Sequence, residues 1–151
     1  MSDCIFCRII AGQAPASLVY RDDVVCAFMD VQPVNAGHVL VVPVAHASGL
    51  ADLPPTATGQ LMQVGQRIAL ALRGSGLPCE GVCLYLVDGV AAGQEVLHVH
   101  LHVFPRYAGD GFGLRLPPDY GRPVTRGELD RAAAQIRRAL PMTVEDQDAQ
   151  A

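Results

Sequence analysis

The fold is decided by the stretch Leu97-His98-Val99-His100-Leu101-His102-Val103-Phe104-Pro105-Arg106, in which histidines alternate with aliphatic residues. Because successive side chains of a β-strand point to opposite faces, this alternation predicts a strand with its three histidines on one face. The aliphatic residues then share the opposite, buried face (Leu97, Val99, Leu101 and Val103). At a strand rise of ~3.3 Å per residue, same-face neighbours are about 6.6 Å apart. Such a row of imidazoles can bind a metal, hold an anion or perform nucleophilic and acid–base chemistry near neutral pH.

The composition limits the class of protein. With 151 residues, half of them apolar, a single domain with a sizeable core is expected. No apolar stretch approaches the ~20 residues of a membrane span. An odd number of cysteines, five, and an N-terminus without a basic segment followed by an apolar one indicate a cytoplasmic protein. A net charge of −4 without a basic stripe argues against extended nucleic-acid binding. Binding of a small anionic ligand in a local pocket is still compatible with this charge.

The rest of the chain predicts an α+β fold. Short strands are expected at residues 18–20, 24–29, 38–44 and 82–87, with the histidine strand as the fifth. A short helical turn at 4–10 precedes them. A longer helix begins near residue 55, and its apolar residues share one face (Leu61, Val64, Ile68 and Leu72). The simplest assembly is a mostly antiparallel five-stranded sheet with helices packed on one face.

The segment Cys4-Ile5-Phe6-Cys7 is a Cys-x-x-Cys pair, for which three interpretations exist. A redox dithiol usually opens a helix after a strand, and only three residues precede this pair. Half of a zinc site is the second interpretation, because this spacing lets both thiolates meet one metal. Chance is the third. With His46 and His98 as partners, Cys4 and Cys7 would complete a closed, structural Cys₂His₂ site.

The loop from Asp88 to Glu95 leads directly into the histidine run, and its glycines and alanines allow a ligand to approach the backbone closely. Successive backbone amides can form an anion-binding concavity, to which Gln94 could add a side-chain donor. The alternative is an ordinary hairpin loop. Beside three histidines, phosphate becomes the favoured ligand, because imidazole attack on phosphorus needs donors for the charged oxygens and an acid for the leaving group.

These segments resemble the histidine triad (HIT) family, most closely its bacterial Hint-like, zinc-binding type. The family motif His-x-His-x-His-x-x, with apolar x, reads His98-Val99-His100-Leu101-His102-Val103-Phe104 here. Further matching segments are Cys-Ile-Phe-Cys-Arg-Ile-Ile-Ala-Gly near the start, Ala27-Phe28-Met29-Asp30, Gly37-His38-Val39-Leu40-Val41-Val42-Pro43 and Ala92-Gly93-Gln94-Glu95-Val96. The resemblance implies the histidine triad fold, a homodimer, a purine nucleotide such as AMP as ligand, and hydrolysis of nucleoside 5′-phosphoramidates or related substituted AMP.

The resemblance runs from about residue 4 to residue 106, and the composition of the remaining residues completes the expected domain layout. Residues 1–106 form the histidine triad domain. Residues 107–151 form a Gly/Pro-rich loop, a C-terminal helix and an acidic tail of the same domain. A capping box, Thr125-Arg126-Gly127-Glu128, marks the start of that helix.

Catalytic roles are implied residue by residue. His100 resembles the nucleophile that takes the nucleotidyl group, and the backbone carbonyl of His98 would orient its ring. His102 resembles the residue that contacts the α-phosphate or assists proton transfer. His38 matches a further histidine near the nucleophile, and Gln94 matches a contact to the phosphate or leaving group.

Ligand-binding roles follow in the same way. Asp30 resembles the carboxylate that accepts both ribose hydroxyls, which suits a bidentate acceptor. The complete nucleotide-binding set is Phe6, Ile9, Phe28, Met29, Asp30, Val31, Leu40, Gly93, Gln94 and His102. The structural zinc ion would be held by Cys4, Cys7, His46 and His98.

Two positions depart from the family pattern. Val87 stands where many Hint-like proteins carry Asn, and Glu95 stands where some relatives have a Ser or Thr that assists leaving-group protonation. The preferred leaving group is therefore open. The alternatives to a phosphoramidase are a dinucleoside polyphosphate hydrolase, a nucleotide-binding regulatory module with incidental turnover, and a metal-carrying protein that uses all the histidines and both N-terminal cysteines.

Overall fold

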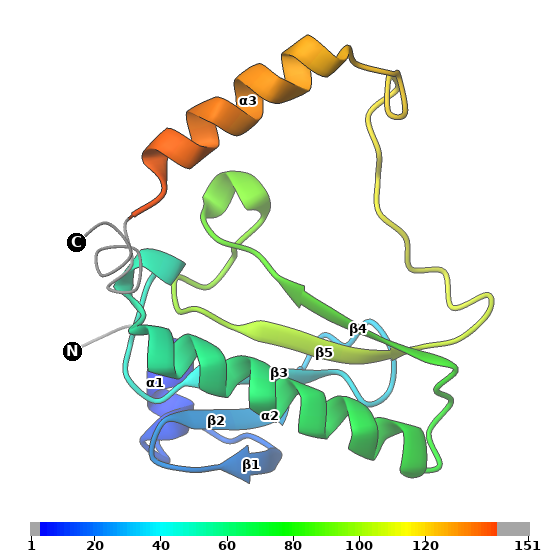
Figure 1. Ribbon diagram of the computed structural model, residues 1–151. Helices are drawn as coiled ribbons and strands as arrows, with labels where there is room; N and C mark the ends of the chain where they lie inside the picture. The colour runs from blue at the N-terminus through cyan, green and yellow to red at the C-terminus, as the bar shows by residue number, and fades with distance from the viewer. Residues whose placement is uncertain (1–3, 142–151) are drawn as a thin grey trace. The chain divides into compact units, whose positions relative to one another are not determined.

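The computed structural model describes residues 4–141 and divides into two compact units, one ending at Phe112 and the other beginning at Gly113. The first unit contains five strands, two helices and two short 3₁₀ turns; Figure 1 shows how the strands and helices are arranged. Their bounds are α1 Ile5–Ile10, β1 Leu18–Arg21, β2 Val25–Met29, β3 Val39–Pro43, η1 Leu50–Asp52, α2 Pro55–Gly74, β4 Gly81–Leu86, η2 Val90–Ala92 and β5 Leu101–Arg106.

The strands form one sheet in the order β1-β2-β3-β5-β4, and every neighbouring pair is antiparallel. The expected α+β class with a five-stranded antiparallel sheet is confirmed. Strand β3 is the central strand of the sheet. Proline is tolerated at its last position, Pro43, because the strand ends there and no further amide donor is needed for the ladder. Leu40 lies opposite His102 on β5 and opposite Phe28 on β2, so these three side chains share one face.

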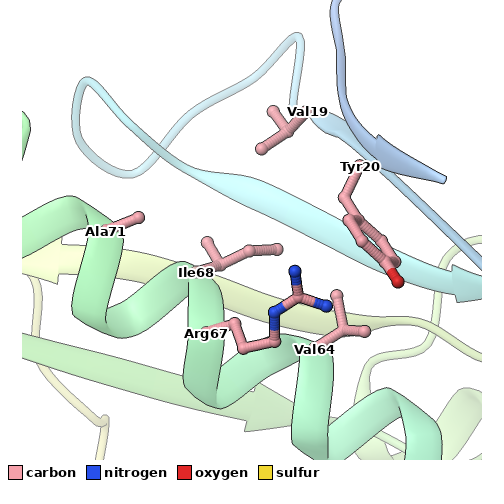
Figure 2. A pocket seen from close by; sticks show the side chains of 6 residues that line it. All are labelled: Val19, Tyr20, Val64, Arg67, Ile68 and Ala71. Carbon is pink, nitrogen blue, oxygen red and sulfur yellow. The ribbon is translucent and has the colours of Figure 1, made fainter.

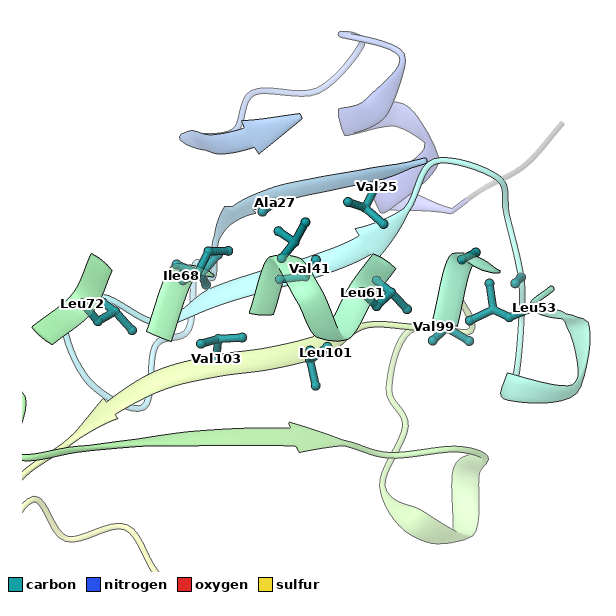
Figure 3. Packing of buried hydrophobic residues seen from close by; sticks show 14 residues of the cluster. Val25, Ala27, Val41, Leu53, Leu61, Ile68, Leu72, Val99, Leu101 and Val103 are labelled. Atoms are coloured by element: carbon teal, nitrogen blue, oxygen red, sulfur yellow. The ribbon is translucent and has the colours of Figure 1, made fainter. Parts of the chain in front are cut away.

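Each face of the sheet carries its own core. On one face α2 packs its apolar stripe onto alternate residues of β2, β3 and β5, as Figure 3 shows. Burying each such side chain contributes about 1.5–3 kcal/mol. The short α1 packs against the opposite face in a second cluster, so only the long helix follows the expectation that helices cover one face. This second cluster comprises Phe6, Ile10, Cys26, Phe28, Leu40 and Val42.

The histidine run enters the sheet later than its alternation predicts. The ladder of β5 begins at Leu101, and Leu97 is 54% exposed. The chain bends before the strand, because the His98 amide donates to the carbonyl of Val96 (2.8 Å) and the Val99 amide donates to the carbonyl of Ala47 (2.7 Å). The prediction that Leu97 shares the buried face is therefore wrong, whereas Val99, Leu101 and Val103 all lie in the core under α2.

The second unit contains α3, Arg126–Ala139. Its capping box is confirmed: the Thr125 hydroxyl accepts from the Glu128 amide, and the Glu128 carboxylate accepts from the Thr125 amide. Leu129 and Ile136 of this helix, and Leu140 directly after it, have exposed side chains. The expected acidic tail, residues 142–151, lies outside the described residues. Across residues 4–141, no helix is both long and apolar enough to cross a bilayer.

Candidate active site and metal centre

Four histidines gather on the sheet face that carries α1. His102 lies on β5, His38 directly precedes β3, and His98 and His100 lie in the bend that leads into β5. The ring centroids of His100 and His102 are 4.8 Å apart. Phe6 of α1 meets the His100 ring edge-on at 5.3 Å. The structure therefore brings the predicted catalytic histidines together, and all but His102 are buried.

His100 is held with one defined ring nitrogen available for reaction. Its Nδ1 lies 2.7 Å from the carbonyl oxygen of His98. A carbonyl only accepts, so Nδ1 carries the proton and donates it to this bond. Nε2 of the neutral ring then keeps its lone pair. This is the atom that a nucleophilic imidazole needs.

His38 and His102 form a hydrogen-bonded relay. The amide of Val34 donates to Nδ1 of His38 (3.1 Å), so the proton of the neutral His38 ring is on Nε2. That Nε2 lies 2.9 Å from Nδ1 of His102 and donates to it. The proton of neutral His102 is thereby placed on Nε2, where it can be donated to a ligand. Each bond fixes the tautomer of the next ring.

Burial keeps both rings of this relay uncharged near neutral pH. Desolvation lowers the pKa of His102 to about 4, and the neighbouring imidazoles of His100 and His38 act in the same direction. Desolvation also lowers the pKa of His38, against the opposing attraction of Asp30. A neutral His102 is a hydrogen-bond donor at Nε2 that does not need to be protonated first.

Asp30 stands at the far end of the relay. Its Oδ2 lies 3.6 Å from Nδ1 of His38 and 4.0 Å from Nδ1 of His102. A carboxylate and two imidazoles at these distances are also a candidate set of metal ligands. Geometry favours the relay, because His38 turns Nδ1 toward Asp30 and Nε2 toward His102. One imidazole does not present both nitrogens to the same ion.

A separate cluster brings together Cys4, Cys7, His46 and His98, whose donor atoms all lie within 4.8 Å of one another. The Sγ of Cys7 is 3.3 Å from Nδ1 of His46 and 3.6 Å from Nδ1 of His98. The Sγ of Cys4 is 3.4 Å from Nδ1 of His98, and the two Nδ1 atoms are 3.3 Å apart. The donors come from the start of α1, the loop after β3 and the bend before β5.

These distances fit a tetrahedral zinc ion. With Zn–S bonds of about 2.3 Å and Zn–N bonds of about 2.05 Å, tetrahedral S···N edges are about 3.6 Å and N···N edges about 3.3 Å. The tautomer of His98 also fits: Nε2 donates to the carbonyl of Pro43 (2.9 Å), which leaves Nδ1 unprotonated toward the thiols. Burial lowers the pKa of His98 and so favours the neutral ring that a metal requires.

Gln94 lies at the predicted position, but both ends of its side-chain amide are occupied. Oε1 accepts from the Gly89 amide at 2.7 Å, and Nε2 donates to the carbonyls of Ser48 (2.9 Å) and Val96 (3.1 Å). It therefore fastens the loop that contains η2 to the segment after β3. A phosphate contact from Gln94 stays a prediction, and it requires one of these bonds to be exchanged. Glycine suits position 93 because its φ is +97°.

The predicted base-binding residues divide into two groups. Phe6, Ile9, Phe28 and Leu40 share the apolar cluster under α1, where the rings of Phe6 and Phe28 meet edge-on at 5.4 Å. Met29 packs with the core on the α2 face, and Val31 is 93% exposed in the loop after β2. The structure thus places four of these six side chains beside the histidines. The β-strand alternation that puts Phe28 on this face sends Met29 to the other.

Two surface hollows lie away from the relay. One, of about 200 Å³, lies between β1 and α2 and is lined by Val19, Tyr20, Val64, Arg67, Ile68 and Ala71, with the Arg67 guanidinium 4.8 Å above the Tyr20 ring (Figure 2). The other lies beside the cysteine–histidine cluster, and exposed Glu95 is part of its wall. Neither is lined by His38, His100 or His102.

Sequence reasoning missed Asn35 and Asp110, two hydrogen-bonded residues that join the turn before β3 to the loop after β5. Asn35 is buried, and the carboxylate of Asp110 accepts hydrogen bonds from Asn35 and Arg106. Asn35 lies in a turn and Asp110 in a glycine-rich loop, so no periodicity marks either residue. An isolated buried amide or carboxylate gives no sequence signal until its partners are known.

Comparison with known proteins agrees with this geometry. Residues 11–109, more than half of the chain, match the family model described as the HIT domain. The chain belongs to the HIT family. A HIT-like protein of Mycobacterium tuberculosis is 44% identical over 138 residues, covering 87% of this chain and 94% of that protein. An adenylylsulfatase of Arabidopsis thaliana is 33% identical over 110 residues, covering 72% of this chain and 55% of that protein.

A solved structure of this HIT family has a direct bearing on the metal cluster. It is a Zn-bound histidine triad family protein from Mycobacterium smegmatis, 43% identical, with a TM-score of 0.71 over 91% of this chain and 98% of that chain. The resemblance recognised in the sequence is therefore confirmed, both for the family and for its fold. The matched region ends at residue 109, and the first compact unit ends at Phe112. That the remaining residues belong to the same domain stays a prediction.

Proposed function

We propose that this HIT-family protein is a nucleotide hydrolase that cleaves purine nucleoside 5′-phosphoramidates, or related substituted AMP, through a nucleotidyl intermediate on His100. One observation carries the proposal. The His98 carbonyl fixes the proton of His100 on Nδ1, and the His38–His102 relay fixes the proton of His102 on Nε2. Adjacent rings thus supply a nucleophile with a free lone pair and a neutral proton donor.

In the first half of the reaction, Nε2 of His100 attacks the α-phosphorus. A P–N bond to His100 forms while the bond from phosphorus to the leaving amine breaks, and the electron pair goes to the leaving nitrogen. His102 donates its Nε2 proton to that nitrogen. Proton donation of this kind is typically worth 10²–10⁴-fold in rate. As His102 donates, its Nδ1 takes up the Nε2 proton of His38 across their 2.9 Å hydrogen bond, and the relay stays one proton short until the water of the second half-reaction supplies it.

In the second half, water attacks the same phosphorus and the bond to His100 breaks. Nε2 of His100 recovers its lone pair, the water proton returns to the relay, and AMP leaves. Asp30 lies at the end of the relay with a side chain 16% exposed, and we assign it to the ribose hydroxyls. The apolar surface of Phe6, Ile9, Phe28 and Leu40 is assigned to the base.

We further propose that Cys4, Cys7, His46 and His98 hold a structural Zn²⁺ ion. The support is the agreement of the donor distances with a tetrahedral site and the Zn-bound relative. When bound, the ion supplies a cross-link between α1 and the bend before β5. His98 links this centre to the reaction through its backbone, because the residue whose ring faces the metal donors also offers the carbonyl that orients His100.

The experiment is the release of AMP from adenosine 5′-phosphoramidate by the wild type, His100→Ala and a control, Gln60→Ala. Gln60 is a hydrogen-bonding residue of α2, whose side chain reaches Asp22 rather than the histidines. We expect turnover by the wild type and the control, and a loss of several orders of magnitude in His100→Ala. Near-normal turnover by His100→Ala would rule out the covalent mechanism.

Adenylyl sulfate is a second candidate substrate, because an adenylylsulfatase is among the relatives. It presents the same α-phosphate with a different leaving group. Diadenosine polyphosphate is the third substrate to compare, and preference for it would assign the protein to dinucleotide hydrolysis. AMP binding without turnover of any of the three would indicate a regulatory module. More than one transition metal per chain, without stabilisation by nucleotide, would indicate a metal carrier. A homodimer and a cytoplasmic location stay predictions.

A further inference from the structure

We infer that Asn35 and Asp110 are positioning residues for the reaction: they fix the tautomer of His38 and, through it, the proton that His102 delivers to the leaving group. This inference rests on the proposed function and deepens it. The side chain of Asn35 bonds to Pro105 and Asp110 rather than to a histidine, and both Asn35 and Asp110 lie outside the motifs that mark the site. We trace their effect through His38, whose amide donates to the carbonyl of Asn35.

The turn that precedes β3 holds His38 by its backbone. The amide of Val34 donates to the His38 ring at Nδ1 (3.1 Å), and the His38 amide donates to the carbonyl of Asn35 (3.1 Å). At Nδ1 the ring is therefore held by a main-chain group of the turn, whereas its Nε2 meets the side chain of His102. A turn that shifts by a few tenths of an ångström carries the Val34 donor away from Nδ1, and the His38 ring loses the bond that selects its tautomer.

The Asn35 side chain anchors this turn to the end of β5. Its Nδ2 donates to the carbonyl of Pro105 (2.8 Å) and to Oδ2 of Asp110 (2.9 Å). Asn35 is 7% exposed, so these bonds are shielded from water. Both protons of the amide are used, and replacement by a side chain without donors frees the turn from β5.

Asp110 holds the Asn35 side chain in place. Its carboxylate accepts from the Arg106 guanidinium, from Asn35 and from the amide of Phe112 (3.1 Å). The Arg106 hydrogen bonds hold the pKa of Asp110 well below its usual range, so it stays ionised. The side chain is 3% exposed. An ionised carboxylate with this many donors has a single orientation, which it imposes on Asn35.

The same anchor supports the His38 ring from the side. Arg106 donates to the carbonyl of Phe112 (2.7 Å) and lies 4.7 Å above the Phe112 ring. Phe112 meets Phe104 at 5.1 Å, and Phe104 in turn packs against the His38 ring at 4.9 Å. The backbone bond at Nδ1 and this aromatic wall together confine one imidazole, which is the arrangement that a proton relay needs.

The test compares two leaving groups. The amine of adenosine 5′-phosphoramidate needs a proton to leave, whereas the sulfate of adenylyl sulfate leaves as a stable anion. We expect Asn35→Ala to lower kcat about 10–100-fold for the phosphoramidate and less than about 3-fold for adenylyl sulfate, since the second substrate bypasses general-acid catalysis. Gln60→Ala, which removes an amide from the comparable carboxylate Asp22, should change neither rate. Equal losses on both substrates, or none, would overturn the inference.

Two further measurements keep the test decisive. Asp110→Asn removes the charge from the other side of the same hydrogen bond and should give the same split between substrates. Nitrogen-15 spectroscopy of the His38 ring should show a single tautomer with the proton on Nε2 in the wild type and a mixture of tautomers in either variant. A single unchanged tautomer in both variants contradicts the positioning role. If the wild type hydrolyses neither substrate, the proposed function fails, and the ring spectrum alone then decides this inference.

Discussion

Replacing Gly37 with alanine tests how tightly the turn before His38 is packed. Gly37 has a φ of +99°, and an added Cβ would lie 2.8 Å from Cδ1 of Leu77 and 3.0 Å from Cδ2 of Leu72. A left-handed conformation costs alanine about 1–2 kcal/mol. The close contacts add about 1–2 kcal/mol, near the lower end of the overpacking range because the exposed Leu77 side chain can move. We therefore expect Gly37→Ala to lower the free energy of unfolding by about 2–4 kcal/mol.

The matched control is Gly76→Ala, where φ is +81° but nothing lies within 4 Å of the added Cβ. That variant bears the backbone strain alone, about 1–2 kcal/mol. Both variants reduce the entropy of the unfolded chain equally, so this effect cancels in the comparison. Urea titration of the three proteins gives the values, with the same dependence on urea concentration expected throughout. Equal destabilisation of the two variants would refute the close packing of Gly37 against Leu72 and Leu77.

Three further predictions concern acid, metal and helix capping. Because burial holds the pKa of His102 at about 4 rather than 6.5, the native state binds fewer protons than the unfolded chain between pH 4 and pH 6.5. The free energy of unfolding, measured by urea titration at each pH, should therefore fall by up to about 3 kcal/mol from pH 7 to pH 4, and by less in His102→Gln. A chelator should lower the melting temperature of the wild type, which should contain one zinc ion per chain by metal analysis, but not that of Cys7→Ser; an unaffected wild type contradicts the structural metal site. Thr125→Ala should weaken the start of α3 by about 1 kcal/mol, seen as faster amide exchange at Glu128 and Leu129, and unchanged exchange would show that the capping box contributes nothing.

The parts of the fold that have a period could be predicted from the sequence. The alternation from Val99 to Val103 correctly indicates the buried face of β5, and the helical spacing of Leu61, Val64, Ile68 and Leu72 correctly indicates the buried face of α2. The bend at Leu97 could not be predicted, because it depends on a hydrogen bond from Val99 to Ala47, a residue far away in the sequence. Strand order also depends on such non-local pairing.

The candidate site, too, could be predicted from the sequence only in part. Residue types at motif spacing identified the histidines and the cysteine pair, and the structure places their donor atoms within bonding range of one another. Met29 shows the limit of a motif, because it neighbours Phe28 in sequence yet packs on the opposite face of the sheet. Asn35 and Asp110 show a second limit, since what they do depends on partners in another element and leaves no local pattern.

The covalent step at His100 is tested most directly by trapping the intermediate. Wild-type protein is mixed with adenosine 5′-phosphoramidate labelled at the phosphorus, quenched within the first turnover under conditions that preserve phosphohistidine, and digested. We expect one adenylate per active chain, attached to the peptide that contains His100, and none in His100→Ala. Label on another residue, or turnover by the wild type with no protein-bound label at any time, would contradict nucleophilic catalysis by His100.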